Sequence, residues 1–499
     1  MTEATRQRKA IDALERRLDG APFAWAARAW TARAKRGSRF SPADVYRQVA
    51  SGTSPEEQSS ALRQSIRLGG WETAEILGRS LKTHLAQLPL ATRGDVVASL
   101  LELRLGLGQR AEAAAWAAEH HELLATNPRG VALLETVGLP QPAWMVNGQP
   151  NLSGLSKRVG SGQLDTEALV ALFSRRPWCW ITAPEALLLP IISARSEELD
   201  VRVRFLNRFL RVHGVPPLDL RADCEPDNVL GALHRRVPRR RGGPLVSVLV
   251  AARNAERTLD YALQSLLEQT HANLEVLVAD DASSDATALV IRRYAQDARV
   301  RAFRSTENQG AYNTRNALAR LARGEFLTFH DADDFAVPER IEAQLKALSA
   351  SGARASSCGL LRLNADGGVA FFKDHHALRL CRASLFLRRD TFWDLGGLRS
   401  ARFGADEELY AKVGARWGSS SVRRVVAPLV LSLWSPTSAT RVQGSESLED
   451  GFRSPARRAY SELIFQKYVV ARDVTEAELH ARLAETDNHL VPRPIAPLD

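Results

Sequence analysis

Three carboxylates, Asp331, Asp333 and Asp334, stand close together in "FLTFHDADDF", directly after an apolar run that is typical of a buried strand. Two carboxylates in an Asp-x-Asp spacing supply the hard oxygen ligands that Mg²⁺ and Mn²⁺ prefer. Such cations commonly bridge one or two carboxylates to the phosphates of a substrate. The spacing alone is common in proteins, but its place at the end of a strand favours a divalent cation site.

The elements around this stretch alternate between strands and helices. Strands are predicted over "LVSVLVAA", "LEVLVADD", "VRAFRS" and "GEFLTFHDADD", and helices over "RTLDYALQSLLEQT", "DATALVIRRYAQD" and "GAYNTRNALARLA". Continuous apolar strands that alternate with helices of this length indicate a parallel sheet built from βαβ units. Ligands of such sheets bind at the carboxyl ends of the strands.

Polar residues gather where these strands end. Asn254 follows the first strand, Asp280 and Asp281 end the second, and Asp331 and Asp333 close the fourth. A single acidic residue at such a position is often only a helix cap. Three clusters that converge on one edge of a sheet instead predict a binding site.

The order and spacing of these blocks resemble the nucleotide-binding half of the family 2 inverting glycosyltransferases, which have the GT-A fold. The resemblance rests on "VSVLVAARNAERTLDYALQSLLEQTHANLEVLVADDASSDAT" and "ENQGAYNTRNALARLARGEFLTFHDADDFAVPERIEAQ". It covers residues 244–345 closely and extends loosely to about residue 435. It implies an α/β domain with a Rossmann-like, mostly parallel sheet that binds a nucleotide sugar.

The resemblance implies a role in nucleotide-sugar binding for five residues. Ala252 and Asn254 would lie along the base. One of Asp280 and Asp281 would hold a uracil, and Arg315 would contact the base or the diphosphate. The donor that it implies is therefore a UDP-sugar.

The resemblance also implies that Asp331 and Asp333 bind a divalent cation, Mn²⁺ or Mg²⁺, with Asp333 as the direct ligand. Inversion at the anomeric carbon further requires a base, because the acceptor hydroxyl must lose its proton as it attacks. The stretch "RFGADEELYAKVG" resembles the second acidic motif of the family. Asp406 matches the base, and Glu407 and Glu408 are substitutes for it. The alternative is that these acids only face the positive end of a helix.

Several positions depart from the family pattern or lie beyond it. Ala282 replaces a glycine that is frequent in the Asp-Asp-Gly-Ser turn. His330 stands where an aliphatic residue is usual, and it either packs at the strand end or contacts the metal or diphosphate. His375 and His376 would reach the site if their loop folds over it, and Trp434 would stack on an acceptor sugar. The Gln-x-x-Arg-Trp block and the membrane helices of processive synthases are absent, which favours transfer of single sugars.

The remainder of the chain divides by composition. Two weakly similar helical stretches, "GGWETAEILGRSLKTHLAQL" and "LGQRAEAAAWAAEHHELL", fit either helix-pair repeats of the tetratricopeptide kind or an irregular bundle. The basic stretch "HRRVPRRRGGP" is typical of a linker. The expected domains are a helical region over 1–135, a mixed or helical extension over 136–233, the basic linker over 234–243, the GT-A domain over 244–445 and a helical tail over 446–499.

The composition is that of an ordinary globular protein of 499 residues, 45% hydrophobic and 25% charged. The four cysteines have no CxxC spacing, so we expect them to be reduced, with neither a disulfide framework nor a zinc site. No apolar run approaches the roughly 18 residues that cross a bilayer, and the N-terminus is not signal-like. We therefore expect a cytoplasmic protein. Its formal charge of +10 favours anionic partners.

These observations predict a metal-dependent inverting glycosyltransferase, of hexosyl or N-acetylhexosaminyl type, that uses a nucleotide sugar and a glycan or other hydroxyl acceptor. The resemblance implies a place in bacterial surface polysaccharide or glycoconjugate synthesis. Two alternatives stay open: a degenerate domain that senses nucleotide sugar or acts as a scaffold, and a nucleotidyltransferase, which the lack of a Gly-rich phosphate loop disfavours.

Further partners are expected from the other regions. The helical region either binds a protein partner or is an inert scaffold, because helix arrays present broad surfaces. The basic linker is either solvated or in peripheral contact with an anionic membrane at its inner face. Nucleic acid is not expected, because no recognition motif accompanies the basic residues.

Overall fold

A computed structural model of the chain describes residues 54–68, 70–137, 139, 145–146, 149–150, 188, 199–221, 229–240, 242–365, 367–369, 377–434, 455–469 and 495–498. The chain forms two compact units. Unit 1 comprises Met1–Pro217, Asp366–Ala377 and Ser447–Arg453, and unit 2 comprises Leu218–Ala365, Leu378–Glu446 and Ser454–Asp499. Within the residues just given, no helix is both long enough and apolar enough to cross a bilayer.

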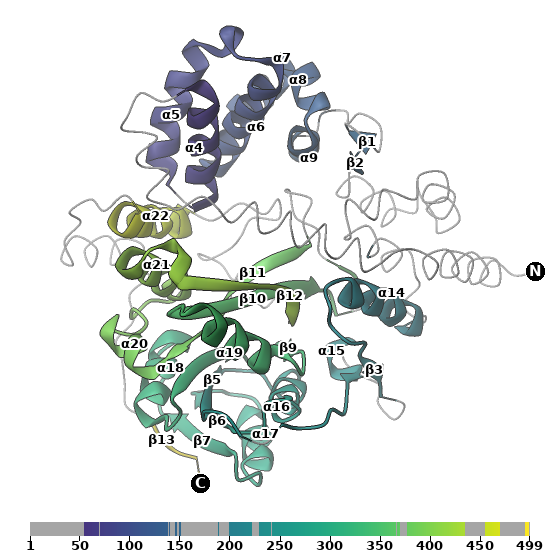
Figure 1. The fold of residues 1–499 in the computed structure, drawn as a ribbon, viewed down its shortest axis with the longest axis vertical. Helices are drawn as coiled ribbons and strands as arrows, with labels where there is room; N and C mark the ends of the chain where they lie inside the picture. Colours follow the sequence, from purple (N-terminus) through teal and green to yellow (C-terminus); the bar gives the residue numbers. More distant parts are fainter. Residues whose placement is uncertain are drawn as a thin grey trace, which may run out of the picture. The chain divides into compact units, whose positions relative to one another are not determined.

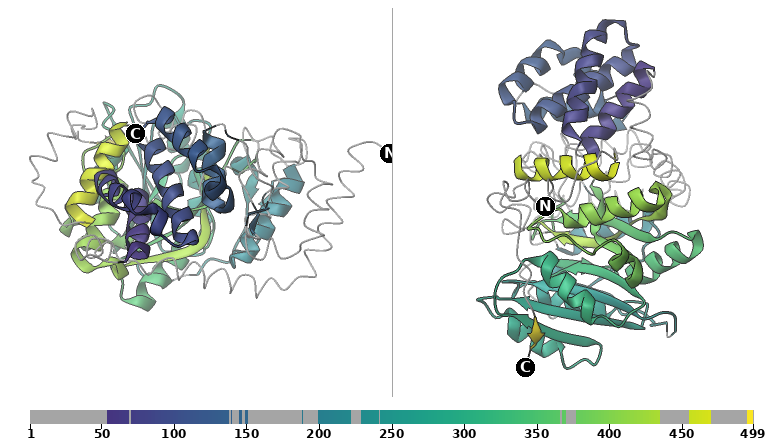
Figure 2. Two further views of the ribbon diagram at one scale, coloured as in Figure 1. Left: turned by 90° about the horizontal axis from the view of Figure 1, so that it is seen from above. Right: turned by 90° about the vertical axis from the view of Figure 1, so that its left-hand side faces the viewer.

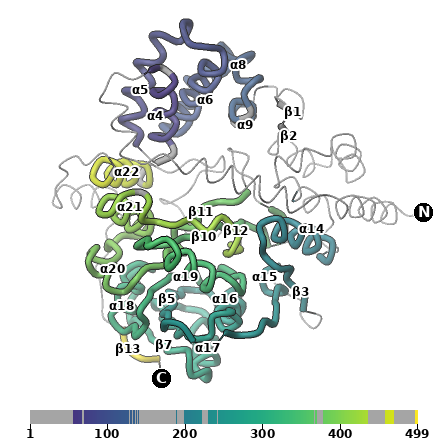
Figure 3. Tube along the Cα trace, viewed as in Figure 1, coloured from purple at the N-terminus to yellow at the C-terminus, as the bar shows by residue number. Residues whose placement is uncertain are grey.

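The described part of unit 1 is mainly helical. Its elements are α4 (Pro55–Leu68), α5 (Trp71–Thr83), η1 (Leu85–Gln87), α6 (Leu90–Gly106), α7 (Arg110–Glu119), α8 (His121–Thr126), α9 (Pro128–Thr136), β1 (Met145–Val146), β2 (Gln149–Pro150) and α14 (Leu199–Val212). The helices α4, α5 and α6 lie side by side (Figure 1, Figure 2). Because α6 also contacts α7, α8 and α9, the helices pack around one central helix, as in an irregular bundle (Figure 3).

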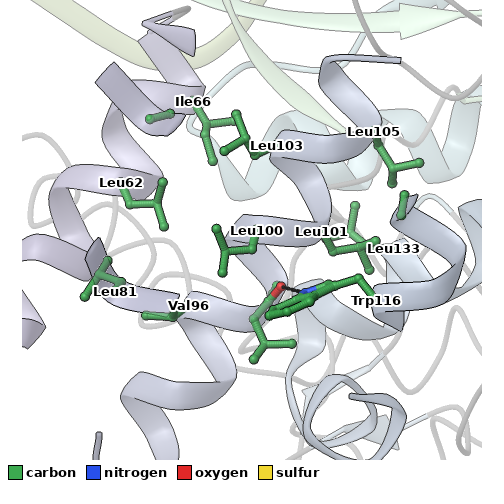
Figure 4. Close-up of a cluster of buried hydrophobic side chains, with 14 of the residues drawn as sticks. Leu62, Ile66, Leu81, Val96, Leu100, Leu101, Leu103, Leu105, Trp116 and Leu133 are labelled. Atoms are coloured by element: carbon green, nitrogen blue, oxygen red, sulfur yellow. Dashed lines mark hydrogen bonds between the residues drawn. The ribbon is translucent and has the colours of Figure 1, made fainter. Parts of the chain in front are cut away.

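Aliphatic side chains of α6 fill the centre of this bundle (Figure 4). Leu100, Leu101 and Leu103 are each at most 5% exposed. Trp116 of α7 is buried beside them, and its indole N–H donates to the backbone oxygen of Val97 at 3.2 Å. This hydrogen bond satisfies the one polar group that the indole ring carries into the core. The Ala and Leu residues of these helical stretches are thus explained by their burial between the helices of the bundle.

Nine strands in the described part of unit 2 form one sheet, in the order β13-β7-β6-β5-β8-β11-β10-β12-β9. They are β5 (Val246–Ala252), β6 (Leu274–Asp281), β7 (Val300–Ser305), β8 (Phe326–Asp331), β9 (Asp334–Ala336), β10 (Ala355–Leu363), β11 (Leu378–Arg388), β12 (Val422–Leu433) and β13 (Ala496–Pro497). The central strands β7, β6, β5 and β8 are parallel, and β11 joins β8 antiparallel. The expected α/β class with a largely parallel central sheet is confirmed.

Helices cover both faces of this sheet (Figure 1). Alternate side chains of a strand point to opposite faces. Val246, Val248 and Val250 of β5 pack in one cluster with α16 (Leu259–Leu267), α17 (Thr287–Tyr294) and α19 (Arg340–Ser351). Leu249 of the same strand packs in the other cluster, with α18 (Ala311–Leu321), α20 (Arg389–Asp394) and α21 (Ala405–Trp417). Burial on both faces explains why the strands are continuously apolar.

The end of the chain adds a strand to one edge of the sheet. β13 pairs antiparallel with β7, with Ala496 opposite Arg304 (Figure 3). The backbone N–H of Leu498 donates to the oxygen of Ala302 at 3.1 Å. Among the described residues, the expected helical tail contains α22 (Pro455–Ile464) and the π-helical turn η4 (Phe465–Val469). It therefore also contains a strand, which the sequence pattern does not predict.

The basic stretch that was expected to form a linker is anchored on unit 2. It follows β3 (Asp219–Leu220), α15 (Val229–Ala232) and β4 (Leu233–His234), and β3 pairs with β4. Arg235 is 8% exposed and forms an ion pair with Glu339. Arg240 pairs with Glu342 at 2.7 Å, and its backbone N–H donates to Thr270. These two arginines therefore neutralise carboxylates of the protein itself.

Candidate active site

The turn after β5 is tied to the turn after β6. Asn254, which follows the buried end of β5 at Ala252, has a φ of 49°, in the left-handed region that Asn tolerates better than most residues. Its backbone N–H donates to Ser283 Oγ at 3.0 Å, and its side-chain oxygen accepts the N–H of Ser284 at 3.0 Å. The two turns thus form a single surface at the carboxyl ends of the strands, where Ala252 and Asn254 were expected.

The two acids that end β6 have different surroundings. The two carboxylate oxygens of Asp281 accept the N–H groups of Gln309 and Gly310, at 3.0 and 2.8 Å, so this residue caps the start of α18. Burial raises the pKa of Asp281, and these hydrogen bonds offset part of the rise. Asp280 is fully buried. Within the described parts of the chain its Oδ2 accepts no hydrogen bond, and it forms an ion pair with the exposed guanidinium of Arg304 at 3.5 Å. Of the two acids, Asp280 is thus the one whose carboxylate is not fully engaged in hydrogen bonds to the described residues.

The negative charges of the three acids at the end of β8 and just after it are balanced by nearby positive charge to different degrees. Asp331 forms an ion pair with Arg315 of α18. Burial would raise the pKa of Asp331, but the charge and hydrogen bond of Arg315, with the charges of His330 and Arg340, together outweigh burial and lower the pKa. In β9, burial and the two neighbouring acids raise the pKa of Asp334 well above its usual range. In the turn between them, burial and the charge of Asp331 raise the pKa of Asp333 to about 7. The charges of Arg362 and Arg315 oppose this rise without cancelling it.

His330 contacts a buried guanidinium and the backbone. Arg340 Nη1 lies 2.8 Å from Nδ1 of His330, and because a guanidinium can only donate, Nδ1 must accept. The other ring nitrogen, Nε2, therefore carries the proton and donates to the backbone oxygen of Asp334 at 3.0 Å. Burial and the charge of Arg340 lower the pKa of His330 to about 3. Both ring nitrogens are occupied within the protein, which fits the packed strand-end role and leaves neither for metal or diphosphate.

Helix α18 joins the acids after β8 to the acid at the start of α21. Tyr312 and Arg315 stand three residues apart and so lie on one face of α18. Arg315 pairs with Asp331, and the Tyr312 hydroxyl donates to Asp406 Oδ1 at 2.7 Å. Asp406 is in the first turn of α21. The structure thus connects Asp331 and Asp406, which are distant in the sequence, through neighbouring side chains of one helix.

The two substitutes for Asp406 are engaged elsewhere. Glu407 forms an ion pair with Arg382 at 2.7 Å. Glu408 is fully buried, and Arg399 donates to it at 2.8 Å. Burial would raise the pKa of Glu408, but hydrogen bonds from Arg399 and the charge of Lys412 outweigh burial and hold the pKa at about 2. Of the three acids, Asp406 is therefore the best placed to accept a proton.

The part of the chain that carries these residues matches a known family. The sequence model described as "Glycosyl transferase family 2" matches residues 247–410, which include every expected site residue from Ala252 to Asp406. Residues 247–410 belong to glycosyl transferase family 2.

Curated relatives match part of this chain over part of their own length. The Escherichia coli protein named UDP-Glc:alpha-D-GlcNAc-diphosphoundecaprenol beta-1,3-glucosyltransferase WfgD is 37% identical over 101 residues, 20% of this chain and 40% of that protein. The succinoglycan biosynthesis protein ExoO of Rhizobium meliloti (strain 1021) is 33% identical over 143 residues, 28% of this chain and 41% of that protein. The chain thus spans less than half the length of either relative.

Solved structures also resemble the chain. The structure of S. aureus TarS 1-349 in complex with UDP-GlcNAc covers 48% of this chain and 71% of that chain, at 16% sequence identity and a TM-score of 0.36. A score of this size supports no inference about the donor or the site.

The acids of the glycosyltransferase domain fit the divalent cation that the family resemblance implies. No group of three or more His, Cys, Asp and Glu residues in the described parts of the chain could hold a metal ion. A bound Mg²⁺ commonly takes one or two carboxylates from the protein and substrate phosphates as further ligands. Burial and the charge of Asp331 raise the pKa of Asp333, and a bound cation would favour its anionic form against both. Asp331, already paired with Arg315, would be the secondary ligand.

Sequence reasoning missed two residues of this site. Tyr312 contacts the expected base, and the one signal for it was its position one helical turn before Arg315. Arg340 is fully buried and supports His330, but its surroundings in "PERIEAQ" are those of an ordinary amphipathic helix. Both contacts depend on side chains that come from elsewhere in the chain.

Three other expected contacts have different outcomes. His375 and His376 lie outside the described residues. Trp434, at the end of β12, stacks against the guanidinium of Arg362, with 4.5 Å between the guanidinium carbon and the ring centroid. Stacking on an acceptor sugar therefore stays a prediction for Trp434.

Proposed function

We propose that the glycosyltransferase domain transfers a single sugar from a UDP-sugar to a hydroxyl of a glycan or other acceptor, with inversion and with a divalent cation. The link through α18 carries the proposal. Arg315 pairs with Asp331, and Tyr312, one turn earlier on the same face of α18, donates a hydrogen bond to Asp406. An inverting transfer needs these two functions together, because one stabilises the leaving group while the other accepts a proton.

On the nucleotide side, we assign the uracil contact to Asp280. A uracil N–H would give Asp280 Oδ2 the hydrogen bond that this buried oxygen lacks. Asp281 cannot easily take this part, because both of its oxygens already cap α18. The E. coli relative is named for UDP-Glc, which supports the same nucleotide.

The proposed reaction moves one proton and exchanges one bond. The acceptor oxygen forms a bond to the anomeric carbon, and its proton passes to Oδ2 of Asp406. The bond from the anomeric carbon to the diphosphate oxygen breaks, and its electron pair leaves on the diphosphate. When bound at Asp333 and Asp331, a divalent cation supplies electrostatic stabilisation of that charge. Arg315 keeps the carboxylate of Asp331 in place during the transfer.

Release of UDP from UDP-glucose and UDP-N-acetylglucosamine tests the proposal, with GDP-mannose as the contrasting donor. We expect release with Mn²⁺ and none after chelation with EDTA. Asp333→Asn and Asp406→Asn should each lower the rate by about 100-fold or more. The matched control is Asp394→Asn, which removes an exposed carboxylate of α20 and should leave the rate unchanged.

The outcomes separate the alternatives. Thermal unfolding of each variant shows whether a lost rate reflects misfolding. Full turnover by both Asp333→Asn and Asp406→Asn would refute the assigned roles. Stabilisation of the wild type by a donor without any release of UDP would favour the degenerate sensor.

The biological setting belongs to the same proposal. A role in bacterial surface polysaccharide or glycoconjugate synthesis fits relatives whose names refer to a diphosphoundecaprenol-linked acceptor and to succinoglycan. A cytoplasmic location, a protein partner for unit 1 and peripheral contact with an anionic membrane stay predictions.

A further inference from the structure

The Tyr312 hydroxyl has a fixed hydrogen-bond direction at the candidate base. It lies 2.7 Å from Asp406 Oδ1 and 3.1 Å from the backbone nitrogen of Gly404. A backbone N–H can only donate, so the hydroxyl accepts from Gly404. Its single proton is then directed at Asp406. Burial and the charge of Asp406 raise the pKa of Tyr312 well above its usual value, so the hydroxyl keeps this proton at ordinary pH.

We propose that Tyr312 is a positioning residue for the base, which fixes the carboxylate of Asp406 through Oδ1 and presents Oδ2 to the acceptor hydroxyl. The inference rests on the proposed function. Among the described residues, Tyr312 is the hydrogen-bond partner of Asp406 Oδ1, and Oδ2 has none. The proton that leaves the acceptor therefore goes to Oδ2, while the hydrogen bond at Oδ1 holds the carboxylate in one orientation.

Charged groups around this pair act at longer range. Arg315 of α18 and Arg382 of β11 interact electrostatically with Asp406, and Arg457 of α22 interacts with Tyr312. Arg315 is paired with Asp331, and Arg382 is paired with Glu407 on the same helix as Asp406. The positive charge of both arginines is thus shared with another carboxylate. Removal of the Tyr312 hydroxyl therefore affects Asp406 more directly than removal of either arginine would, because Tyr312 contacts the carboxylate.

A neutral donor suits a base better than a cation does. Glu408, two residues further along α21, shows the effect of a cation, because Arg399 and Lys412 hold that carboxylate ionised down to strongly acidic pH. A carboxylate in such a pair is a poor proton acceptor. The Tyr312 hydroxyl instead fixes the orientation of Asp406 without placing a full positive charge against its carboxylate.

The variant Tyr312→Phe removes the hydroxyl and keeps the ring. Loss of a hydrogen bond to a carboxylate favours its protonated form. We expect the acid limb of kcat/KM for UDP release from UDP-glucose with Mn²⁺ to move upward by about one pH unit. We also expect kcat to fall about tenfold, with little change in the KM for the donor. A purely structural role would not move the acid limb.

Tyr294→Phe is the matched control, because it also removes a hydroxyl that donates to a carboxylate. Tyr294 OH donates to Asp260 Oδ1 at 3.0 Å, between α17 and α16, on the opposite face of the sheet from α18. We expect the acid limb and kcat of this variant to match those of the wild type.

A measurement without turnover separates the contact from the reaction. The chain has seven tyrosines, so protein labelled with ¹³C at tyrosine Cζ gives few signals, and the Tyr312 signal is the one that Tyr312→Phe lacks. We expect this signal to shift in acid as Asp406 gains a proton, and to stay constant over the same pH range in Asp406→Asn.

Two results would overturn the inference. One is a Tyr312 signal whose pH dependence is the same in the wild type and in Asp406→Asn. The other is an acid limb and a kcat that are unchanged in Tyr312→Phe. Absence of UDP release by the wild type would instead refute the proposed function and with it the catalytic part of the inference, while the ¹³C titration would still decide whether Tyr312 and Asp406 are coupled.

Discussion

The substitution Glu408→Gln removes one negative charge from the contact between α21 and α22. Glu408 is fully buried, accepts hydrogen bonds from Arg399, Tyr460 and Tyr468, and lies 3.3 Å from Nζ of Lys412. A glutamine fills a similar volume but leaves the two cations without their anion. Breaking a buried ion pair in this way is usually costly, because an uncompensated charge stays behind.

The expected size of the effect follows from the pKa of Glu408. Burial would raise it, but hydrogen bonds from Arg399 and the charge of Lys412 lower it from 4.5 to about 2. A carboxyl group with a lowered pKa stabilises the folded state above its unfolded pKa, and this stabilisation disappears as pH falls through the folded pKa. The shift corresponds to about 3 kcal/mol. This contribution is fully present above about pH 4.5 and lost near pH 2.

Urea unfolding of unit 2 measures this contribution. Limited proteolysis with mass spectrometry of peptides from α21 and α22 reports on unit 2, since the two units need not unfold together. At pH 7.5 we expect Glu408→Gln to lower the free energy of unfolding by about 3 kcal/mol. At about pH 3 the difference from the wild type should be less than half as large, because much of Glu408 is then protonated in the unfolded chain.

Glu407→Gln is the matched control for this prediction. It changes the neighbouring residue of the same helix, whose carboxylate pairs with Arg382 nearer to solvent. We expect it to cost less than about 1 kcal/mol. Equal losses for the two variants would refute the reasoning, as would a loss in Glu408→Gln that does not shrink as the pH falls.

Three further changes test the fold by thermal unfolding. Ala282 has a φ of 56°, which costs a residue other than glycine roughly 1–2 kcal/mol, so Ala282→Gly should raise the unfolding midpoint; a lower midpoint would contradict the strain. Arg340→Lys should lower the midpoint, because one ammonium cannot replace the fork that reaches Thr328 Oγ1, the Phe329 oxygen and His330 Nδ1; an unchanged midpoint would contradict this. Deletion of residues 495–499 should lower the midpoint and increase light scattering, because it uncovers the edge of β7; unchanged values would show that β13 contributes nothing.

The central strands could be predicted from the sequence because local patterns determine them. The stretches "LEVLVADD" and "VRAFRS" have the same bounds as β6 and β7. The strand after α18 was expected to continue to Asp334, but β8 ends at Asp331, and Asp334 begins β9, whose partner Ser432 lies in β12. Nothing close to Asp334 in the sequence indicates this pairing, because its partner strand comes from a distant part of the chain.

The residue types of the site were likewise predictable, whereas their partners were not. From the sequence, Asp280 and Asp281 are equivalent candidates. In the structure, the backbone N–H of Gly310 at the start of α18 donates to Asp281, so the two carboxylates differ in their hydrogen bonds. In the same way Asp406 and Glu408 differ because α22, from the end of the chain, brings Tyr460 to Glu408 alone. Tertiary contacts, which a single sequence does not show, thus decide which carboxylate of each group is left for a ligand or a proton.

The distribution of positive charge around the acids is itself an argument for their roles. Three carboxylates in one turn repel one another. Arg315 forms an ion pair with Asp331, whereas for Asp333 burial and the charge of Asp331 outweigh the charges of the nearby arginines. Asp406 receives a neutral hydroxyl, whereas Glu408 receives Arg399. A site for a cation needs an uncompensated carboxylate, and a base needs one that is oriented without an ion pair. If Asp333 were the base and Asp406 a structural acid, we would expect a neutral hydrogen-bond donor beside Asp333 and an ion pair at Asp406.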